Sequence, residues 1–389
     1  MATAIEAITT LLTLSGLAYL VLVLWSARDF VHSWRRTPID TGSAPDVSIL
    51  KPVKGVDPRM YAGLVSHCRQ EYAGRFEILF GVGSLDDPAV KEIERLRVEF
   101  PACAIRVVEC RERLGTSGKV SNLVQMLREA SYEHVLINDS DIFVSPRYLK
   151  RVMASFSDEG VGLVTAPYVG RTAERGPERT VWARLEGLGI STDFIPGVLT
   201  ARKLEGGIRF GLGSTLATSK TVLARAGGLE ALVEYLADDY EMGVRIAGAG
   251  YRVVLCDEVV ETTVPAYTFR GFWDHQLRWA RSTRDARKLG YMGLGITYAL
   301  PWAVMTCVAS GLALWSISLL SVVVLARVSV ALSVGVGVLN DGQVLRDLWL
   351  LPLRDFFGLF FWGWSFAGDT VVWRGEVFRL RDGRIHPIA

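Results

Sequence analysis

The chain has 389 residues, of which 50% are hydrophobic and 22% are charged, and its mean hydropathy is +0.26. It is too apolar for an ordinary soluble enzyme and too charged for a bundle of membrane helices, so its apolar residues must be gathered in separate segments. The 43 basic and 41 acidic side chains leave a net charge of +2, which gives no support for nucleic-acid binding. Five scattered cysteines without a C-x-x-C pair favour reduced thiols over a disulfide framework or a structural zinc site.

The first predicted element is a membrane span within residues 1–27. The stretch from Ala7 to Trp25 is uncharged, and about 20 helical residues cross the roughly 30 Å core of a bilayer. A cleaved signal peptide is the alternative, but the stretch lacks a positively charged start and a small-residue cleavage site. Arg28, Arg35 and Arg36 follow it, so the positive-inside rule places the next domain in the cytoplasm.

Residues 28–289 alternate short β-rich runs with segments of helical spacing. The predicted strands are Val47–Leu50, Phe76–Val82, Ile105–Val108 and Val135–Ile137, and the predicted helices include Ala89–Phe100 and Val120–Ala130. This alternation predicts an α/β domain with a mostly parallel, Rossmann-like sheet. Sheets of this kind bind ligands beyond the carboxyl ends of their strands.

Acidic residues follow two of these strands. Asp139 and Asp141 come after Val135–Ile137, where two carboxylates can hold one Mg²⁺ or Mn²⁺ that also binds a diphosphate, although this pair taken alone favours an ordinary Asp-rich turn. Asp86 and Asp87 follow Phe76–Val82, and the sequence alone favours a helix cap there over a nucleotide contact.

Three further groups offer chemistry. Asp239 lies beside Asp238 at a predicted helix start, where a carboxylate is favoured by the helix dipole and is also well placed to act as a base. Lys119 lies near another helix start, a place that receives anions. His275, Arg278 and Arg281 are three residues apart on one helical face, which can neutralise a diphosphate or rest on anionic lipid headgroups.

The remaining chain is again apolar. Residues 290–345 contain the tract Ile296–Leu339, which is long enough for two spans that form a hairpin, and a basic helical segment precedes it on the predicted cytoplasmic side. Residues 346–389 contain a stretch of 12 uncharged residues, Phe356 to Ala367. That stretch is short for a span and favours a re-entrant or interfacial helix, followed by a basic tail.

In combination, these motifs resemble the ceramide glucosyltransferase family, which has a D…D…D…(Q/R)-x-x-R-W signature on a GT-A fold. The residues that carry the resemblance are Asp87, Asp139-x-Asp141, Asp239 and Arg278-Trp279, with support from Ser48–Pro58, Asp86–Ala89, Lys119–Leu123, Gly227–Leu229, Leu353–Asp355 and Val372–Gly375. The resemblance covers nearly the whole chain.

The resemblance implies an inverting transfer of a hexose from a UDP-sugar to a lipid hydroxyl at the bacterial inner membrane. Asp239 would then be the general base, Asp139 and Asp141 would hold the metal and the diphosphate region, and Asp87 would hold the uridine. Donor contacts would also come from Lys119, His275, Arg278 and Trp279. Trp182, Phe194 and Phe210 remain open between an acceptor pocket and the core.

One position departs from the family pattern. His275 stands where the signature has Gln or Arg, and in this the chain resembles the bacterial hopanoid glycosyltransferases, which attach an N-acetylhexosamine to a polycyclic lipid alcohol. The acceptor therefore stays open between a ceramide and a hopanoid. Two other classes also remain as alternatives, namely a processive polysaccharide synthase and an inactive scaffold that binds lipid or nucleotide.

Overall fold

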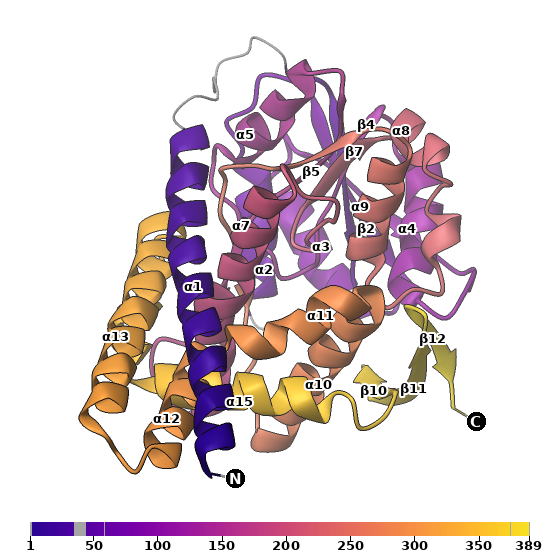
Figure 1. The fold of residues 1–389 in the computed structure, drawn as a ribbon. Helices are drawn as coiled ribbons and strands as arrows, with labels where there is room; N and C mark the ends of the chain where they lie inside the picture. The colour runs from indigo at the N-terminus through magenta and orange to yellow at the C-terminus, as the bar shows by residue number, and fades with distance from the viewer. Residues whose placement is uncertain (1, 35–43, 58, 374, 389) are drawn as a thin grey trace.

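The computed structural model describes residues 2–34, 44–57, 59–373 and 375–388. Arg35 and Arg36, on which part of the orientation prediction depends, lie outside this range. The described chain forms an α/β domain at one end and a group of long helices at the other (Figure 1).

A seven-stranded sheet forms the centre of the α/β domain, in the order β3-β2-β1-β4-β7-β5-β8. Strands β1, β2, β3 and β4 are mutually parallel, β5 and β8 are parallel to each other, and only β7 runs antiparallel to its neighbours. The bounds are β1 Val47–Pro52, β2 Phe76–Val82, β3 Ala104–Glu109, β4 His134–Ile137, β5 Val161–Thr165, β7 Leu216–Ser219 and β8 Arg252–Leu255. The four predicted strands are confirmed, and so is the mostly parallel sheet.

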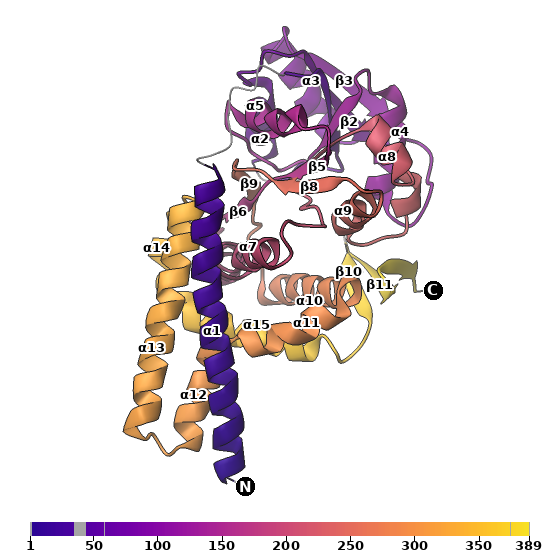
Figure 2. The ribbon, with the colours of Figure 1, turned by 45° about the horizontal axis from the view of Figure 1, so that its top comes forward.

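Helices flank this sheet, as expected for a parallel sheet that is buried on both faces. They are α2 Met60–Cys68, α3 Ala89–Glu99, α4 Gly118–Glu129, α5 Tyr148–Ala154, α8 Lys220–Arg225 and α9 Asp238–Gly248. A small parallel pair, β6 Tyr168–Arg171 and β9 Val260–Thr263, lies between the sheet and the helical end of the molecule (Figure 2). This pair brings the edge of the α/β domain toward the apolar helices.

Two helices are long and apolar enough to cross a membrane within the described residues: Thr3–Trp34, in α1 (Ala2–Trp34), and Leu314–Val338. The second consists of α13 (Leu314–Val330) and the π-helix η5 (Ala331–Val338). Before it comes α12 (Ala299–Ala309), which meets Lys288–Thr297 at a bend of 50°. Eleven residues rise only about 17 Å, so the second span expected in 290–345 is short and stays a prediction.

The segments next to the span region lie across it. Helices α10 (Phe269–Ala286), α11 (Lys288–Leu294) and α15 (Leu351–Trp364) run crosswise to α1 and α13 (Figure 2). With 14 residues, α15 suits the predicted interfacial or re-entrant role. The other helices of this half are α6 Val181–Gly189, α7 Ile195–Leu204 and α14 Gln343–Asp347.

The chain ends differently from the basic tail expected from sequence. Strands β10 (Thr370–Trp373), β11 (Glu376–Arg381) and β12 (Arg384–Pro387) form an antiparallel sheet. Its basic side chains alternate with buried Phe378, Leu380 and Ile385, and this period of two is that of a half-exposed strand. The basic residues of this stretch drew attention away from the alternating apolar residues, which form the buried face of the sheet.

Candidate active site

Buried polar contacts hold the loop after β4 in place. The Asn138 amide donates to the carbonyl of Ser214 (2.6 Å) and to the Tyr148 hydroxyl (3.0 Å). The fully buried Lys51 donates to the main-chain carbonyl of Asp139 at 3.0 Å. Burial lowers the pKa of Lys51 to about 7, although Asp141 and Asp139 act in the opposite direction. Lys51 was missed from sequence because a β-strand lysine is normally read as exposed.

Lys119 joins two of the predicted acidic motifs. Its helix, α4, begins after Ser117, whose hydroxyl accepts from the Val120 N–H. The Lys119 Nζ lies 2.9 Å from Asp139 Oδ1 and 3.3 Å from Asp238 Oδ2. Burial alone lowers the pKa of Lys119, but the carboxylates around it raise it further than burial lowers it, so the net direction is upward. The side chain is therefore a fixed ammonium between Asp139 and Asp238.

Asp239 occupies the first turn of α9 with both carboxylate oxygens oriented by backbone. Oδ2 accepts from the Gly213 N–H at 2.7 Å and Oδ1 accepts from the Tyr240 N–H at 2.8 Å. Burial, followed by the charge of Asp238, raises the pKa of Asp239 to about 6. A carboxylate with such a pKa is well matched to proton abstraction near neutral pH.

Gly213 separates the Asp239 carboxylate from the loop after β4. A Cβ at this position would lie 3.1 Å from Asp239 Oδ2 and 3.7 Å from Asp139 Oδ2. Both carboxylates therefore lie next to Gly213, and a side chain there would crowd Asp239 and touch Asp139. The structure brings together Lys119, Asp139 and Asp239 as the sequence predicted.

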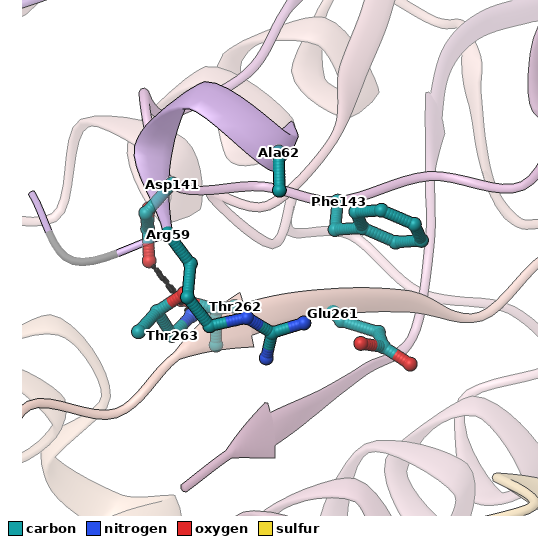
Figure 3. Close-up of a pocket in the computed structure, with 7 residues that line it drawn as sticks. All are labelled: Arg59, Ala62, Asp141, Phe143, Glu261, Thr262 and Thr263. Carbon is teal, nitrogen blue, oxygen red and sulfur yellow. Dashed lines mark hydrogen bonds between the residues drawn. The ribbon is translucent and has the colours of Figure 1, made fainter. Parts of the chain in front are cut away.

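Asp141 points away from Lys119 toward β9. Its Oδ2 accepts from the Thr262 hydroxyl (2.6 Å) and the Thr263 N–H (3.0 Å). Figure 3 shows this contact at the edge of a small depression that Arg59 and Phe143 help to line. Burial, then the neighbouring Asp139, raises the pKa of Asp141. A cation bound beside the two aspartates would relieve that repulsion.

The oxygen atoms of these two aspartates are suitable ligands for a hard divalent cation. Among the described residues, no group of three or more His, Cys, Asp or Glu side chains is placed to hold a metal. Two carboxylates without further protein ligands fit Mg²⁺ or Mn²⁺ that is completed by substrate phosphates and water, since Mg²⁺ is commonly held this way. Asp139 and Asp141 are the residues that would hold it.

Asp87 behaves as the helix cap expected from sequence. It accepts from the Gly55 N–H with both oxygens at 3.0 Å, and its Oδ1 also accepts from the Ala89 N–H at 2.9 Å. It thereby ties the loop after β1 to the start of α3. The uridine contact stays a prediction.

The basic face of α10 divides into two parts. His275 Nδ1 lies 3.3 Å from Glu186 Oε1, and its ring lies between Tyr267 and Trp279, with centroids at 5.3 and 5.4 Å. Arg281, in contrast, is buried and donates to the carbonyls of Ala367 (2.8 Å) and Thr370. Arg281 therefore holds the segment between α15 and β10, which is neither of the two roles considered for it.

Phe194, one of the aromatic candidates, lies beside Trp279 and beside Tyr168, a residue that sequence reasoning missed. The Phe194 ring lies 5.6 Å from Tyr168 and 5.4 Å from Trp279. Burial, then the charges of Asp239, Glu186, Asp139 and Asp141, raises the pKa of Tyr168 well above its usual value. Tyr168 thus lies within electrostatic reach of both the proposed base and the predicted metal-binding aspartates. No spacing rule marks a single tyrosine at the start of a short strand.

The other two aromatic candidates differ. Trp182 packs against Phe269, Phe272 and Phe357 in a core between α6, α10 and α15. Phe210 stacks on Tyr240 with centroids 5.9 Å apart, next to Asp239. Phe210 and Phe194 therefore border the site, and Trp182 does not.

The mostly parallel sheet, with acidic residues gathered beyond its strand ends, defines a GT-A-type glycosyltransferase. A mannosyltransferase from Pyrobaculum calidifontis, solved in complex with GDP-Man and Mn²⁺, has the same fold, with a TM-score of 0.52 and 21% identity over 93% of this chain and 97% of that one. The family model "Glycosyl transferase family 21" matches residues 8–386. The chain belongs to this family.

Two curated relatives come from Caenorhabditis elegans. Ceramide glucosyltransferase 3 is 26% identical over 287 residues, which are 70% of this chain and 59% of the relative. Ceramide glucosyltransferase 1 is 25% identical over 399 residues, which cover 96% of this chain and 81% of the relative. An identity of 25–26% does not identify the donor sugar or the acceptor lipid of this protein.

Proposed function

We propose that the protein is an inverting transferase that moves one hexose from a UDP-sugar, UDP-glucose foremost, to the hydroxyl of a ceramide-like lipid. The observation that carries the proposal is the Asp239 carboxylate, held at the start of α9 with a raised pKa beside the Asp139–Lys119 pair. The ceramide glucosyltransferase relatives support the choice of donor and acceptor.

In the proposed reaction, Asp239 takes the proton from the acceptor hydroxyl as its oxygen attacks the anomeric carbon. The carbon–oxygen bond to the diphosphate breaks, its electron pair leaves on the phosphate oxygen, and attack from the opposite side inverts the anomeric centre. Asp239 keeps lone pairs free for this proton, since each oxygen accepts only one N–H bond from the protein. The divalent cation held by Asp139 and Asp141 would stabilise the charge on the leaving diphosphate.

The remaining groups orient the donor. His275, Arg278 and Trp279 on α10 would bind the leaving diphosphate and shape the acceptor side. Asp87 would contact the uridine, and Lys119 would hold Asp139 in place. The two candidate spans support a site near a bilayer, which we propose to be the bacterial inner membrane with the α/β domain in the cytoplasm.

A second candidate is transfer of an N-acetylglucosamine to a hopanoid alcohol. The observation that favours it is His275, which stands in the motif helix where the signature of the ceramide enzymes has Gln or Arg. His275 Nδ1 lies 3.3 Å from the buried Glu186 Oε1, which supports a role inside the fold rather than at the surface.

A product assay separates these possibilities. The purified protein in lipid nanodiscs is incubated with Mn²⁺ and UDP-glucose, UDP-N-acetylglucosamine or GDP-mannose, each with ceramide, with a hopanoid polyol or without added acceptor. Mass spectrometry should show a single hexose on ceramide from UDP-glucose, and NMR should show the inverted β-linkage. Transfer to the hopanoid alone supports the second candidate, whereas a polymer, a GDP-mannose-only reaction or no product refutes the proposal.

A further inference from the structure

A chain of buried polar contacts begins at an arginine in the second long apolar helix. Arg327, on α13, is 5% exposed and lies within the candidate span. Its Nε donates to both oxygens of Asp355 on α15, at 3.0 and 2.9 Å, and its Nη2 donates to Asp193 Oδ1 at 2.5 Å. A charged side chain at membrane depth is stable only when it is paired in this way.

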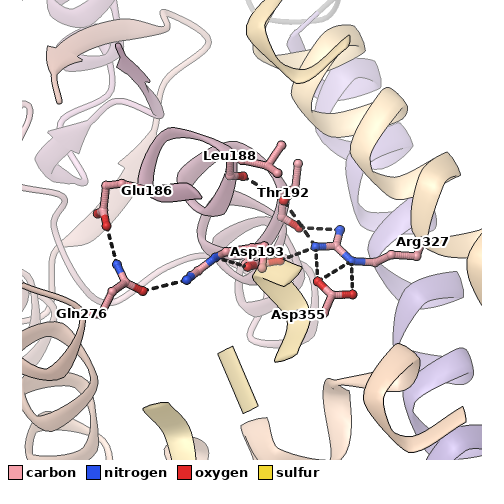
Figure 4. Close-up of polar contacts among 8 residues, drawn as sticks. Glu186, Leu188, Thr192, Asp193, Gln276, Arg327 and Asp355 are labelled. Atoms are coloured by element: carbon pink, nitrogen blue, oxygen red, sulfur yellow. Dashed lines mark hydrogen bonds and ion pairs between the residues drawn. The ribbon is translucent and has the colours of Figure 1, made fainter. Parts of the chain in front are cut away.

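The chain continues to α10. Asp193 Oδ2 accepts from Arg354 Nε at 2.8 Å, and Arg354 Nη1 donates to Gln276 Oε1 at 2.7 Å. Gln276 Nε2 in turn donates to Glu186, as Figure 4 shows. Glu186 Oε1 lies 3.3 Å from His275 Nδ1. Residues from α13, α15, the π-helix η2 (Ile190–Phe194), α6 and α10 thus form one connected series.

The series has a unique sequence of donors and acceptors. Gln276 can satisfy both neighbours in only one amide orientation, because Arg354 offers only donors and the ionised Glu186 only acceptors. Burial raises the pKa of Glu186, but His275, Arg354 and Gln276 together bring it below its usual value. Glu186 and Gln276 are only 3% and 8% exposed. A half-satisfied network at this depth would be costly, so all its members favour one arrangement.

Helix α6 is shaped to admit this series. A Cβ at Gly189 would lie 2.3 Å from Arg354 Nε, a separation that real side chains do not tolerate. Gly189 lies three residues after Glu186, on the same helical face. The glycine therefore makes room for the guanidinium next to the carboxylate that holds His275.

We propose that Glu186 and Arg354 are positioning residues that fix the His275–Trp279 turn of α10 through Gln276 and connect it to the membrane hairpin. The proposal rests on the proposed function, in which this turn binds the leaving diphosphate. His275 Nδ1 faces the Glu186 carboxylate at 3.3 Å, so a proton on that nitrogen would be the one favoured by the charge of Glu186. Nε2 is then the ring nitrogen that remains for a substrate phosphate.

A charge swap tests the proposal. Glu186→Gln alone places an amide where Gln276 needs an acceptor, and Gln276→Glu alone places a second carboxylate against Glu186. In the double variant, the carboxylate introduced at position 276 can accept from Arg354 and from the new amide at position 186, whose oxygen still accepts from His275. Each single change should lower kcat about tenfold at nearly constant acceptor KM, and the double variant should recover most of it, since residues in one network are not additive.

The measurements are made on full-length protein in nanodiscs, per mole of folded enzyme, and thermal unfolding is recorded alongside. Glu94→Gln, which removes an exposed pair with Arg97 on α3, is the matched control and should leave kcat unchanged. Arg354→Lys retains the charge beside Asp193 but lacks a second nitrogen that could donate to Gln276. It should therefore lower kcat as the single changes at positions 186 and 276 do. If one of the single variants at position 186 or 276 does not fold, the kcat of Arg354→Lys tests the positioning role instead.

Two results overturn the proposal. One is wild-type kcat in the folded single variants or in Arg354→Lys. The other is a double variant whose loss equals the product of the two single losses. Failure of the proposed function looks different, because the wild-type protein itself would then neither bind UDP by calorimetry nor form glycolipid.

Discussion

The ammonium of Lys119 lies 2.9 Å from the carboxylate of Asp139 and binds Asp238 on its other side. One cation therefore joins the loop after β4 to the first turn of α9. The same charge lowers the pKa of Asp239, whereas burial and Asp238 raise it. The proposed base and the proposed metal-binding loop share one electrostatic environment.

A pH profile is the first test of this environment. The pKa of Asp239 is raised to about 6, and only the ionised carboxylate can accept a proton. The kcat/KM for the acceptor should therefore be full above about pH 7 and should fall tenfold per unit as pH drops below about 6. In Lys119→Met the positive charge that lowers the pKa is gone, so the acid limb should move to higher pH. Lys91→Met, an exposed change on α3, is the control, and an unmoved limb in Lys119→Met contradicts the assignment.

Asp239→Asn should fold and bind UDP but lose transfer. The amide oxygen can still accept from Gly213 or Tyr240, so the start of α9 is retained, whereas the base is absent. General-base assistance contributes roughly 10²- to 10⁴-fold, and kcat should fall by that amount. Asp86→Asn, an exposed neighbouring carboxylate, should behave as the wild type. If Asp239→Asn keeps more than about a tenth of wild-type turnover, another group is the base.

Much of the site was predictable because it consists of local patterns. Asp139 and Asp239 follow the rule that strand ends and helix starts carry the chemistry of parallel sheets, and the structure brings both to Gly213. The strands were equally visible, because continuous β-branched runs mark a sheet buried on both faces.

The rest depends on contacts between distant segments. Arg281 shares a helical face with His275, yet it donates to the carbonyl of Ala367, in the segment after α15 and more than 80 residues later in the chain. Lys51 and Glu186 are charged residues whose burial becomes visible only after the fold is known. The C-terminal sheet escaped prediction because four arginines in this stretch outweighed its alternating apolar residues.

Metal removal provides a further test. Asp139 and Asp141 repel each other in the absence of a cation, so a divalent ion should bind there together with the donor diphosphate. Dialysed enzyme in excess EDTA should be inactive, and Mn²⁺ or Mg²⁺ should restore it. Asp141→Ala should weaken UDP-sugar binding in the presence of metal but leave binding unchanged in EDTA. Full activity of the dialysed enzyme in EDTA contradicts a metal role.

Membrane orientation can be tested by labelling single cysteines in a variant that lacks the five native thiols. Val98→Cys on α3 and His386→Cys on β12 are exposed in the α/β domain and the C-terminal sheet. Leu314→Cys, at the far turn of the helical hairpin, is also exposed. In inverted inner-membrane vesicles, an impermeant maleimide should label the first two and leave Leu314→Cys unlabelled. Labelling of Val98→Cys from the periplasmic side instead would contradict the cytosolic donor site.

The C-terminal sheet holds the segment that leads into the base. Leu236 donates its N–H to the Gly383 carbonyl at 3.1 Å, and the Ile385 N–H donates to the Glu234 carbonyl at 2.9 Å. The Leu236 side chain packs in a small cluster with Phe378, only three residues before Asp239. Phe378→Ala removes the largest buried member of that cluster, a change that costs about 3–5 kcal/mol in a well-packed core. Here the destabilised element is a peripheral sheet. The substitution should therefore increase the mobility of residues 233–237 and leave the α/β domain folded.

We therefore expect Phe378→Ala to lower kcat by about tenfold, since a small displacement of a base from its working geometry is enough for that loss. Hydrogen–deuterium exchange should rise in 233–237 and in 370–387, with no change in β1 to β4. Val377→Ala, an exposed position of the same strand, is the matched control and should alter neither quantity. If exchange rises while kcat stays at the wild-type value, the C-terminal sheet does not hold the base. If exchange does not change, Phe378 does not support residues 233–237.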